Sequence, residues 1–349
     1  MESQLSLLPD LLLPWYETAK RDLPWRQDRS PYHVWLSEIM LQQTRVEAVK
    51  GYYSRFLDRL PTIADLAEVE ETELLKLWEG LGYYSRVRNL QKAARVIMAQ
   101  HGGSFPRDYA DIRALPGIGD YTAGAISSIC FDERTPAVDG NVLRVVSRFC
   151  DFHGCTDEPA VKKKIGENLK EIYPKAAGAF TQALMEVGAI VCVPNGQPLC
   201  ESCPLQQHCK ARKKGTIDEL PVRAEKKKRR QEDLTLFLLT CGDKVAIRKR
   251  PEKGLLAGLF EFPNVSGTLD AAKIIETAEI WGLHPRYLEK TVGRKHIFTH
   301  IQWNMTGARI HCGSENEEFI WITKEDLKEN YALPTAFRQF VGDIWEETL

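Results

Sequence analysis

Leu115-Pro116-Gly117-Ile118-Gly119 lies between two segments of helical periodicity, and this short run decides the fold of the N-terminal part of the chain. Its two glycines permit a tight turn whose backbone N–H groups point outward. The helix that follows points the positive end of its dipole the same way, so the turn can hold a phosphate without reading a base sequence. We therefore expect Gly117 and Gly119 to contact a phosphate, although a plain connection between two helices would show the same run.

Asp139 follows Gly119 by twenty residues, in the run Val138-Asp139-Gly140-Asn141-Val142, with Arg144 two positions further on. Asp139 precedes an expected helix, and Asp and Asn commonly cap helix N-termini. The combination of LPGIG with VDGNVxR resembles the helix-hairpin-helix, Gly/Pro-rich-loop, aspartate superfamily of DNA glycosylases. The resemblance implies that Asp139 is the essential acidic residue of an active site.

Two different patterns divide the chain. Helical periodicity runs from residue 1 to about 209, and no alternating strand pattern occurs before residue 230. Residues 233–241 and 244–250 flank Gly242-Asp243 and predict a β-hairpin. We place a helical domain at 1–215, a basic linker at 216–231 and an α+β domain at 232–349. The expected helices are 85–101, 120–131, 141–150, 158–173, 178–191, 270–281 and 334–347, and the further strands are 286–292, 301–310 and 319–322.

The totals describe an ordinary globular chain. The 349 residues are 43% hydrophobic with a net charge of −1, which gives no sign of nucleic-acid binding. Residues 210–230, however, hold ten Lys or Arg against three acidic residues, a local net of +7 that fits a solvated linker and a DNA contact. We expect no membrane span, because no run of about 18 apolar residues exists. The N-terminus lacks a signal-peptide pattern, so we expect a cytoplasmic, nucleoid-associated monomer.

Two further runs narrow the superfamily. LSEIMLQQT at 36–44 and WEGLGYYSR at 78–86, together with LPWR at 23–26, resemble the adenine DNA glycosylase family. The endonuclease III branch carries a lysine where Tyr121 stands here, and tyrosine cannot form a Schiff base. The resemblance therefore implies a monofunctional hydrolase that cuts the N-glycosidic bond of adenine.

The C-terminal part resembles that family's second domain. GLFEFP at 258–263 matches a run of its Nudix-like fold, whereas residues 271–282 lack the REx2EE core of a working Nudix box. The resemblance implies a mostly α N-terminal catalytic region, made of a helix-hairpin-helix six-helix barrel domain plus an iron–sulfur cluster domain. It also implies a C-terminal α+β Nudix-like domain that recognises the mismatch rather than hydrolysing a pyrophosphate.

Two carboxyl groups carry the expected chemistry. Releasing adenine requires a proton donor for its N7 and an anion beside the oxocarbenium-like sugar. By resemblance, Glu38 is the acid and later the base for water, and Asp139 stabilises or briefly bonds the sugar. The apolar neighbours of Glu38 predict a raised pKa. Tyr121 is expected beside the flipped sugar, and Asn141 is expected to orient water or phosphate, with helix capping as the simpler alternative.

The extruded adenine needs a pocket that stacks on it and bonds its edge. The resemblance assigns this role to Trp25, Arg26, Leu41 and Gln182. Gln43 and Tyr83 are candidates to fill the hole left in the duplex, although Tyr83 could equally belong to a core.

Four cysteines crowd together, with the spacing Cys192-x7-Cys200-x2-Cys203-x5-Cys209. A disulfide framework is not distributed this way in a large chain, so the spacing predicts a metal centre. The superfamily places a [4Fe–4S] cluster here with six residues in the first gap, where this chain has seven. Structural zinc is the alternative.

The base opposite the adenine must also be read. By resemblance, the substrate is double-stranded DNA with adenine opposite 8-oxoguanine or guanine, and the second domain reads the lesion through a Phe-Ser-His loop. Here Phe298-Thr299-His300 keeps the hydroxyl in Thr299. Gln43, Thr44 and Leu81 are expected to face the lesion from the catalytic side.

Three alternatives stay open at this point. An endonuclease III-like glycosylase/lyase acting on oxidised pyrimidines is the nearest, and Tyr121 and the 36–44 run speak against it. A DNA-binding module without catalysis conflicts with the presence of both Glu38 and Asp139. A Nudix hydrolase with a helical appendage conflicts with the missing box.

Overall fold

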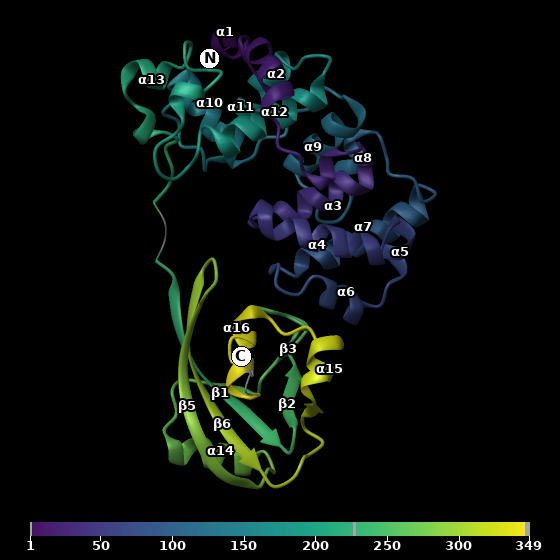
Figure 1. Cartoon of the computed structure of the whole chain (residues 1–349), viewed down its shortest axis with the longest axis vertical. Helices are drawn as coiled ribbons and strands as arrows, with labels where there is room; N and C mark the ends of the chain where they lie inside the picture. Colours follow the sequence, from purple (N-terminus) through teal and green to yellow (C-terminus); the bar gives the residue numbers. More distant parts are fainter. Residues whose placement is uncertain (1, 226–227, 346–349) are drawn as a thin grey trace. The chain divides into compact units, whose positions relative to one another are not determined.

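The computed structural model describes residues 2–225 and 228–345. These residues form two compact units (Figure 1). The helical unit holds the residues up to Glu68 together with Arg88–Glu225. The sheet unit holds Val69–Val87 and the described residues from 228 onward. Lys226 and Lys227 of the expected basic linker, and the last residues of the helix expected at 334–347, lie outside the described residues.

The helices of the helical unit come close to the expected ranges, since α9, α10, α11 and α12 each begin and end within two residues of their prediction. Its elements are α1 (Glu2–Leu5), α2 (Leu8–Ala19), the 3-10 turn η1 (Pro24–Arg26), α3 (Pro31–Leu41), α4 (Val46–Arg59), α5 (Ile63–Glu68), α7 (Ser85–Gln100), α8 (Tyr109–Ala114), α9 (Asp120–Phe131), α10 (Gly140–Cys150), α11 (Pro159–Glu171), α12 (Ala177–Ile190) and α13 (Lys210–Lys214).

The run 115–119 is the turn of a helical hairpin between α8 and α9, as predicted. Gly117 has φ +78°, a conformation that favours glycine, and a Cβ at this position would lie 2.6 Å from Cβ of Asn89 on α7. Gly119 then forms the N-cap of α9. Both the turn and the packing beneath it therefore require Gly117.

Two helices are apolar on most of their circumference and run through the core. Eight of the eleven residues of α3 are buried, from Tyr32 to Met40. Helix α12 packs against α2, α9 and α10. A Cβ at Gly188 would lie 2.6 Å from Cβ of Asn141, so this glycine allows α12 to approach the start of α10. The core thus brings the ends of α3, α9, α10 and α12 near one another.

The sheet unit contains α6 (Glu71–Leu77) and one mixed sheet of the described residues, with strand order β3-β2-β1-β6-β5, β4 on β1 and β7 on β2. Strands β1 and β6 are parallel, and the other pairs are antiparallel. The expected hairpin is confirmed, because Cys241 pairs with Lys244 across the turn. The elements are β1 (Arg230–Cys241), β2 (Lys244–Lys249), β3 (Phe260–Glu261), β4 (Asn264–Ser266), α14 (Ala271–Ile280), β5 (Pro285–Ile297), β6 (Ile301–Cys312), β7 (Ile320–Ile322), α15 (Lys324–Glu329) and α16 (Thr335–Arg338).

Helices cover both faces of this sheet. Alternate residues of β1 point to opposite faces, as expected for a strand: Leu236 and Leu238 join a core with α15 and α16, whereas Phe237 and Leu239 join a core with α14. The single helix expected at 334–347 is wrong. The described part of this segment forms the short α16 and a 3-10 turn at Val341–Asp343 instead, since Gly342 lies inside the expected range and glycine disfavours a continuous helix. Phe337, Phe340 and Ile344 lie in the first core.

Candidate active site

The helical unit contains a cavity of about 610 Å³ where α3, α9, α10 and α12 meet. Eleven of the residues predicted from the sequence line it: Trp25, Arg26, Glu38, Leu41, Gln43, Thr44, Gly119, Tyr121, Asp139, Asn141 and Gln182. They come from segments up to 157 positions apart (from Trp25 to Gln182), and the fold gathers them around one space.

Glu38 is a buried acid at the wall of this cavity. It is only 7% exposed, because α3 is buried almost all round. Burial raises the pKa of its carboxyl from the ordinary 4.5 to about 7, although the hydrogen bond from the Tyr121 hydroxyl (2.5 Å to Oε2) acts in the opposite direction. Glu38 can therefore hold a proton near neutral pH and release it to a bound group.

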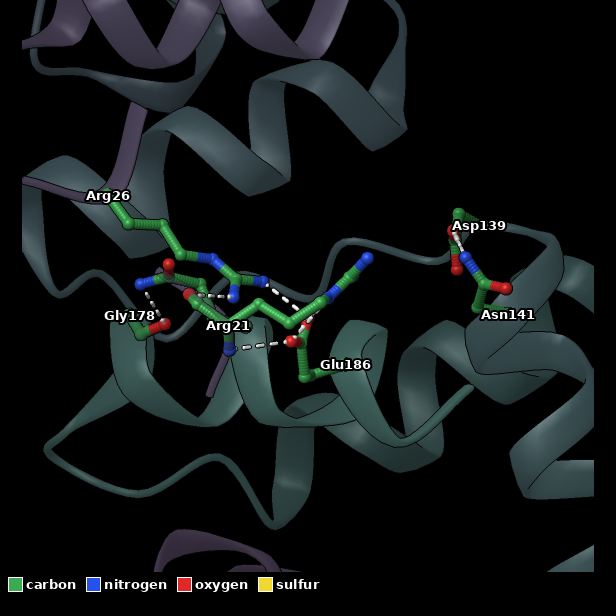
Figure 2. Close-up of polar contacts among 7 residues, drawn as sticks. Arg21, Arg26, Asp139, Asn141, Gly178 and Glu186 are labelled. Atoms are coloured by element: carbon green, nitrogen blue, oxygen red, sulfur yellow. Dashed lines mark hydrogen bonds and ion pairs between the residues drawn. The ribbon is translucent and has the colours of Figure 1, made fainter. Parts of the chain in front are cut away.

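Asp139 faces the same cavity from the N-terminus of α10. Its Oδ1 accepts the backbone N–H of Val142 (2.7 Å), and its Oδ2 accepts the amide of Asn141 (2.7 Å, Figure 2). Burial raises the pKa of Asp139, and these two hydrogen bonds oppose the rise. Asp139 therefore caps its helix as the sequence suggested, and the same hydrogen bonds favour its anionic form beside Glu38.

Asn141 is held in one orientation by Arg144. The Arg144 guanidinium donates to Oδ1 of Asn141 (2.8 Å), to the carbonyl of Gly188 (2.7 Å) and, through Nε, to the carbonyl of Cys192 (2.6 Å). Because Oδ1 of Asn141 is occupied by a donor, its Nδ2 must point to Asp139. One arginine thus connects the carboxylate of the cavity with the start of the cysteine loop.

The sequence reasoning missed an ion-pair network at the cavity wall, which Figure 2 shows. Glu186 on α12 accepts two bonds from the Arg21 side chain (2.7 and 2.9 Å) and one from Arg26 (2.7 Å). Burial raises the pKa of Glu186, but these hydrogen bonds outweigh it and hold the pKa at about 2. The signal that could have revealed it is one acidic residue in the otherwise apolar run LMEVGAI. Glu186 fixes the direction of the Arg26 guanidinium.

The remaining predicted residues lie outside this cavity. Gly117 is in the hairpin turn. Phe298, Thr299 and His300 form the tip between β5 and β6, with Phe298 half-buried against Trp303 and the other two exposed. Leu81 is buried, at 6% exposure, while Tyr83 is 48% exposed.

Within the sheet unit, the hydroxyl of Tyr83 lies 2.7 Å from that of Thr299. Two residues that were predicted separately, one to enter the duplex and one to read the lesion, therefore form a pair. Tyr83 also has φ +48°, an uncommon conformation for a residue with a bulky side chain.

The four cysteines 192, 200, 203 and 209 line one pocket together with Arg148. Burial, with a smaller contribution from the other thiols, raises the pKa of Cys203 to about 12. The Arg148 guanidinium donates to Sγ of Cys192 at 3.4 Å. Within the described ranges, no three His, Cys, Asp or Glu side chains converge closely enough to hold a single metal ion. Four thiols around one pocket beside a cation have the donor chemistry to hold a metal centre, either an iron–sulfur cluster or a zinc ion.

Among the described residues that line the cavity, none supplies an amine for imine chemistry. Its lining in the described structure includes two arginines but no lysine. Tyr121, at the position where the lyase branch carries lysine, donates its hydroxyl hydrogen to Glu38.

No described helix has the length and apolar character that crossing a membrane requires.

Comparisons with known proteins agree with this geometry. The profile of the HhH-GPD superfamily of base excision DNA repair proteins matches residues 36–174, and that of the NUDIX domain matches residues 235–342. The structure of a thermostable thymine-DNA glycosylase superposes on 61% of this chain and 98% of its own, with TM-score 0.56 and 29% identity. A non-covalent endonuclease III–DNA complex covers 62% of this chain and 98% of its own, with TM-score 0.53 and 25% identity. The helical unit therefore has the fold of a helix-hairpin-helix DNA glycosylase.

Curated relatives define the family more narrowly. The human adenine DNA glycosylase is 36% identical over 95% of this chain and 73% of its own length. That of Buchnera aphidicola subsp. Baizongia pistaciae is 36% identical over 95% of both chains. The chain belongs to the adenine DNA glycosylase family. The endonuclease III-like alternative is not favoured.

Proposed function

We propose that this chain removes adenine opposite 8-oxoguanine or guanine in double-stranded DNA by hydrolysing the N-glycosidic bond. Its family acts in base excision repair as DNA N-glycosylases, which are hydrolases. The main support for this substrate and reaction is the shared cavity of Glu38 and Asp139, two carboxyl groups in different environments. Paired carboxyl groups of unequal pKa can divide acid and anion roles at one glycosidic bond.

The reaction follows from these two environments. An adenine base flips out of the duplex into the cavity. Protonated Glu38 donates its proton to N7, the C–N bond breaks, and the anionic Asp139 stabilises the sugar cation. The Glu38 carboxylate then accepts a proton from the attacking water. Tyr121 holds Glu38 during both steps through its hydroxyl.

Specificity for adenine is assigned to the wall of the cavity. Trp25 provides an aromatic surface, Gln182 has an amide that can pair with the adenine edge, and Arg26 is aimed by Glu186. Gln43, with φ +57°, and Thr44 follow directly after α3 at the same cavity. Backbone strain of this kind clusters at functional sites, which supports a contact of Gln43 with the duplex.

The proposal is tested by incubating the purified chain with duplexes that hold adenine opposite 8-oxoguanine, guanine or thymine. We expect alkali-labile sites at the first two and none at the third. Borohydride should trap no covalent adduct, because the cavity lining holds no lysine in the part of the chain that the structure describes. A trapped adduct, or release of an oxidised pyrimidine instead of adenine, would overturn the proposal.

The loop 298–300 should determine recognition of the opposite base. Replacing Phe298 and His300 together by alanine is expected to lower the cleavage rate opposite 8-oxoguanine by about tenfold or more, while binding to undamaged duplex changes little, because loss of contacts to one base leaves phosphate contacts intact. Tyr287→Ala, an exposed aromatic elsewhere on β5, is the matched control. Equal losses on all duplexes would contradict the assignment.

For the cysteine pocket we propose a [4Fe–4S] cluster held by Cys192, Cys200, Cys203 and Cys209, with zinc as the alternative. When bound, the cluster supplies a structural centre that fixes the basic residues of α13 (Lys210–Lys214) toward DNA phosphates. The purified protein should be yellow-brown with about four irons per chain. Cys203→Ser should abolish the colour, whereas Cys155→Ser, outside the pocket, should keep it. Colourless protein with stoichiometric zinc would exclude the cluster.

A further inference from the structure

Two charged side chains in the segment before α7 are unusually well enclosed. Lys76 at the end of α6 is 20% exposed and Glu79 just after it is 9% exposed. Both belong to the sheet unit, although the chain leaves the helical unit at Glu68 and returns to it at Arg88. Long charged side chains are rarely this covered unless they have partners.

Their partners lie in the segment from α15 to α16. Lys76 Nζ donates to the carbonyls of Leu327 (2.8 Å) and Tyr331 (3.1 Å). Oε1 of Glu79 accepts the backbone N–H of Leu333 (2.9 Å). Charge-assisted hydrogen bonds to backbone groups are among the stronger polar contacts in proteins.

The two side chains also form one charged group. Oε2 of Glu79 lies 2.8 Å from Nζ of Lys76 and 3.3 Å from Nη1 of Arg338 on α16. One carboxylate thus contacts two cations and a backbone N–H. We call Lys76, Glu79 and Arg338 the anchor.

Lys76 and Glu79 of the anchor lie directly before the turn that presents Tyr83. The carbonyl of Gly82 accepts from the Trp78 indole (3.1 Å), and that of Leu81 accepts from Arg86 (2.9 Å), so the turn is held from inside. Tyr83 then reaches the hydroxyl of Thr299 at 2.7 Å. The anchor and the Tyr83–Thr299 pair are two contacts of one short segment with the rest of the sheet unit.

We propose that Lys76 and Glu79 are positioning residues for recognition of the base opposite adenine, because they hold the segment that sets Tyr83 beside Thr299. This inference rests on the proposed function of the 298–300 loop as the lesion reader. Neither residue is a contact of the substrate. Their effect passes through the position of Tyr83.

The test compares single-turnover cleavage of adenine opposite 8-oxoguanine and opposite guanine. Glu79→Ala is expected to lower the ratio of these two rates by about five- to tenfold, in line with the loss of a charge-assisted hydrogen bond. Glu79→Gln keeps an acceptor for the N–H of Leu333 and should restore most of the ratio. Glu329→Ala removes an exposed carboxylate from α15 and should leave it unchanged.

A double variant separates positioning from general stability. If Glu79 acts through Tyr83, the double variant Glu79→Ala/Tyr83→Phe should lower the ratio by a factor smaller than the product of the two factors measured for the single variants. Lys76→Met, which keeps the apolar stem, provides the same test if Glu79→Ala fails to fold. Full multiplication of the effects, or equal rate losses on both duplexes, overturns the inference. A wild-type ratio of one overturns the lesion-reading function itself, whatever the variants do.

Discussion

Glu38→Gln is expected to lower the rate of adenine release by about 10³-fold or more at neutral pH, because glutamine cannot donate a proton to N7. Glutamine is nearly isosteric, and its Oε1 can still accept the Tyr121 hydroxyl, so the cavity should keep its shape. Affinity for an A:8-oxoguanine duplex should therefore change little. Glu171→Gln, an exposed position on α11, is the control and should retain full activity.

The pH profile of the wild-type chain should report the same group. Glu38 must be protonated to act as an acid, and its pKa is raised by burial to about 7. The single-turnover rate is therefore expected to fall as pH rises through about 7. On the acid side, the rate should fall where Asp139 becomes protonated, at a pH above the ordinary pKa of an aspartate, since burial raises its pKa as well. A rate that stays flat between pH 6 and about 9 would contradict the assignment of Glu38 as the acid.

The same pKa has a consequence for stability. Glu38 binds its proton more tightly in the folded chain than in the unfolded chain, where its pKa is near the ordinary 4.5. The stability that the proton on Glu38 adds to the folded chain is fully present below pH 4.5 and is lost as pH rises through about 7. At pH 8, the free energy of unfolding of Glu38→Gln should therefore exceed that of the wild type by up to about 3 kcal/mol, which a higher melting temperature would report. At pH 5 the two should differ little. An active-site change that removes activity and adds stability is the pattern expected of a buried functional acid.

The sequence was sufficient to predict that these two carboxyl groups share one cavity, because each stands in a short run that resembles a motif of the family. Glu38 stands in an apolar helix, and Asp139 precedes a helix after a glycine-rich turn. Local signals also predicted the hairpin at Gly242-Asp243, since turn type depends on adjacent residues.

Features that depend on contacts between distant positions were not predictable in this way. The bonds of Glu186 to Arg21 and Arg26 join positions 160 or more apart and arise only after α12 packs. The anchor joins residues 76 and 79 to residues 327–338, which no periodicity reveals. The break in the helix expected at 334–347 was hidden for a different reason: Phe337, Phe340 and Ile344 have the spacing of one helix face, so their periodicity predicts a continuous helix through Gly342.

Asp139→Asn is the substitution that best separates catalysis from structure. Asparagine is as good an N-cap as aspartate, so α10 should still form. It cannot stabilise a sugar cation by charge, and we expect a loss in cleavage rate of about 10³-fold. Asp108→Asn, the same change at the N-cap of α8, should leave the rate unchanged.

A second effect of Asp139→Asn follows from the locked orientation of Asn141. In the wild type, Nδ2 of Asn141 donates to Oδ2 of Asp139, and Arg144 holds Oδ1 of Asn141. In the variant, the oxygen of the new asparagine side chain can still accept the N–H of Val142. Its amide nitrogen then faces Nδ2 of Asn141, which is also a donor. We expect a destabilisation of about 1–2 kcal/mol from this pair of facing donors, measured by chemical unfolding. Adding Asn141→Asp should remove most of this destabilisation, because a carboxylate accepts from both neighbours, but it should not restore cleavage. Recovery of cleavage in the double variant would instead mean that an anion at either position suffices, and the assignment of the sugar-stabilising charge to Asp139 alone would be wrong.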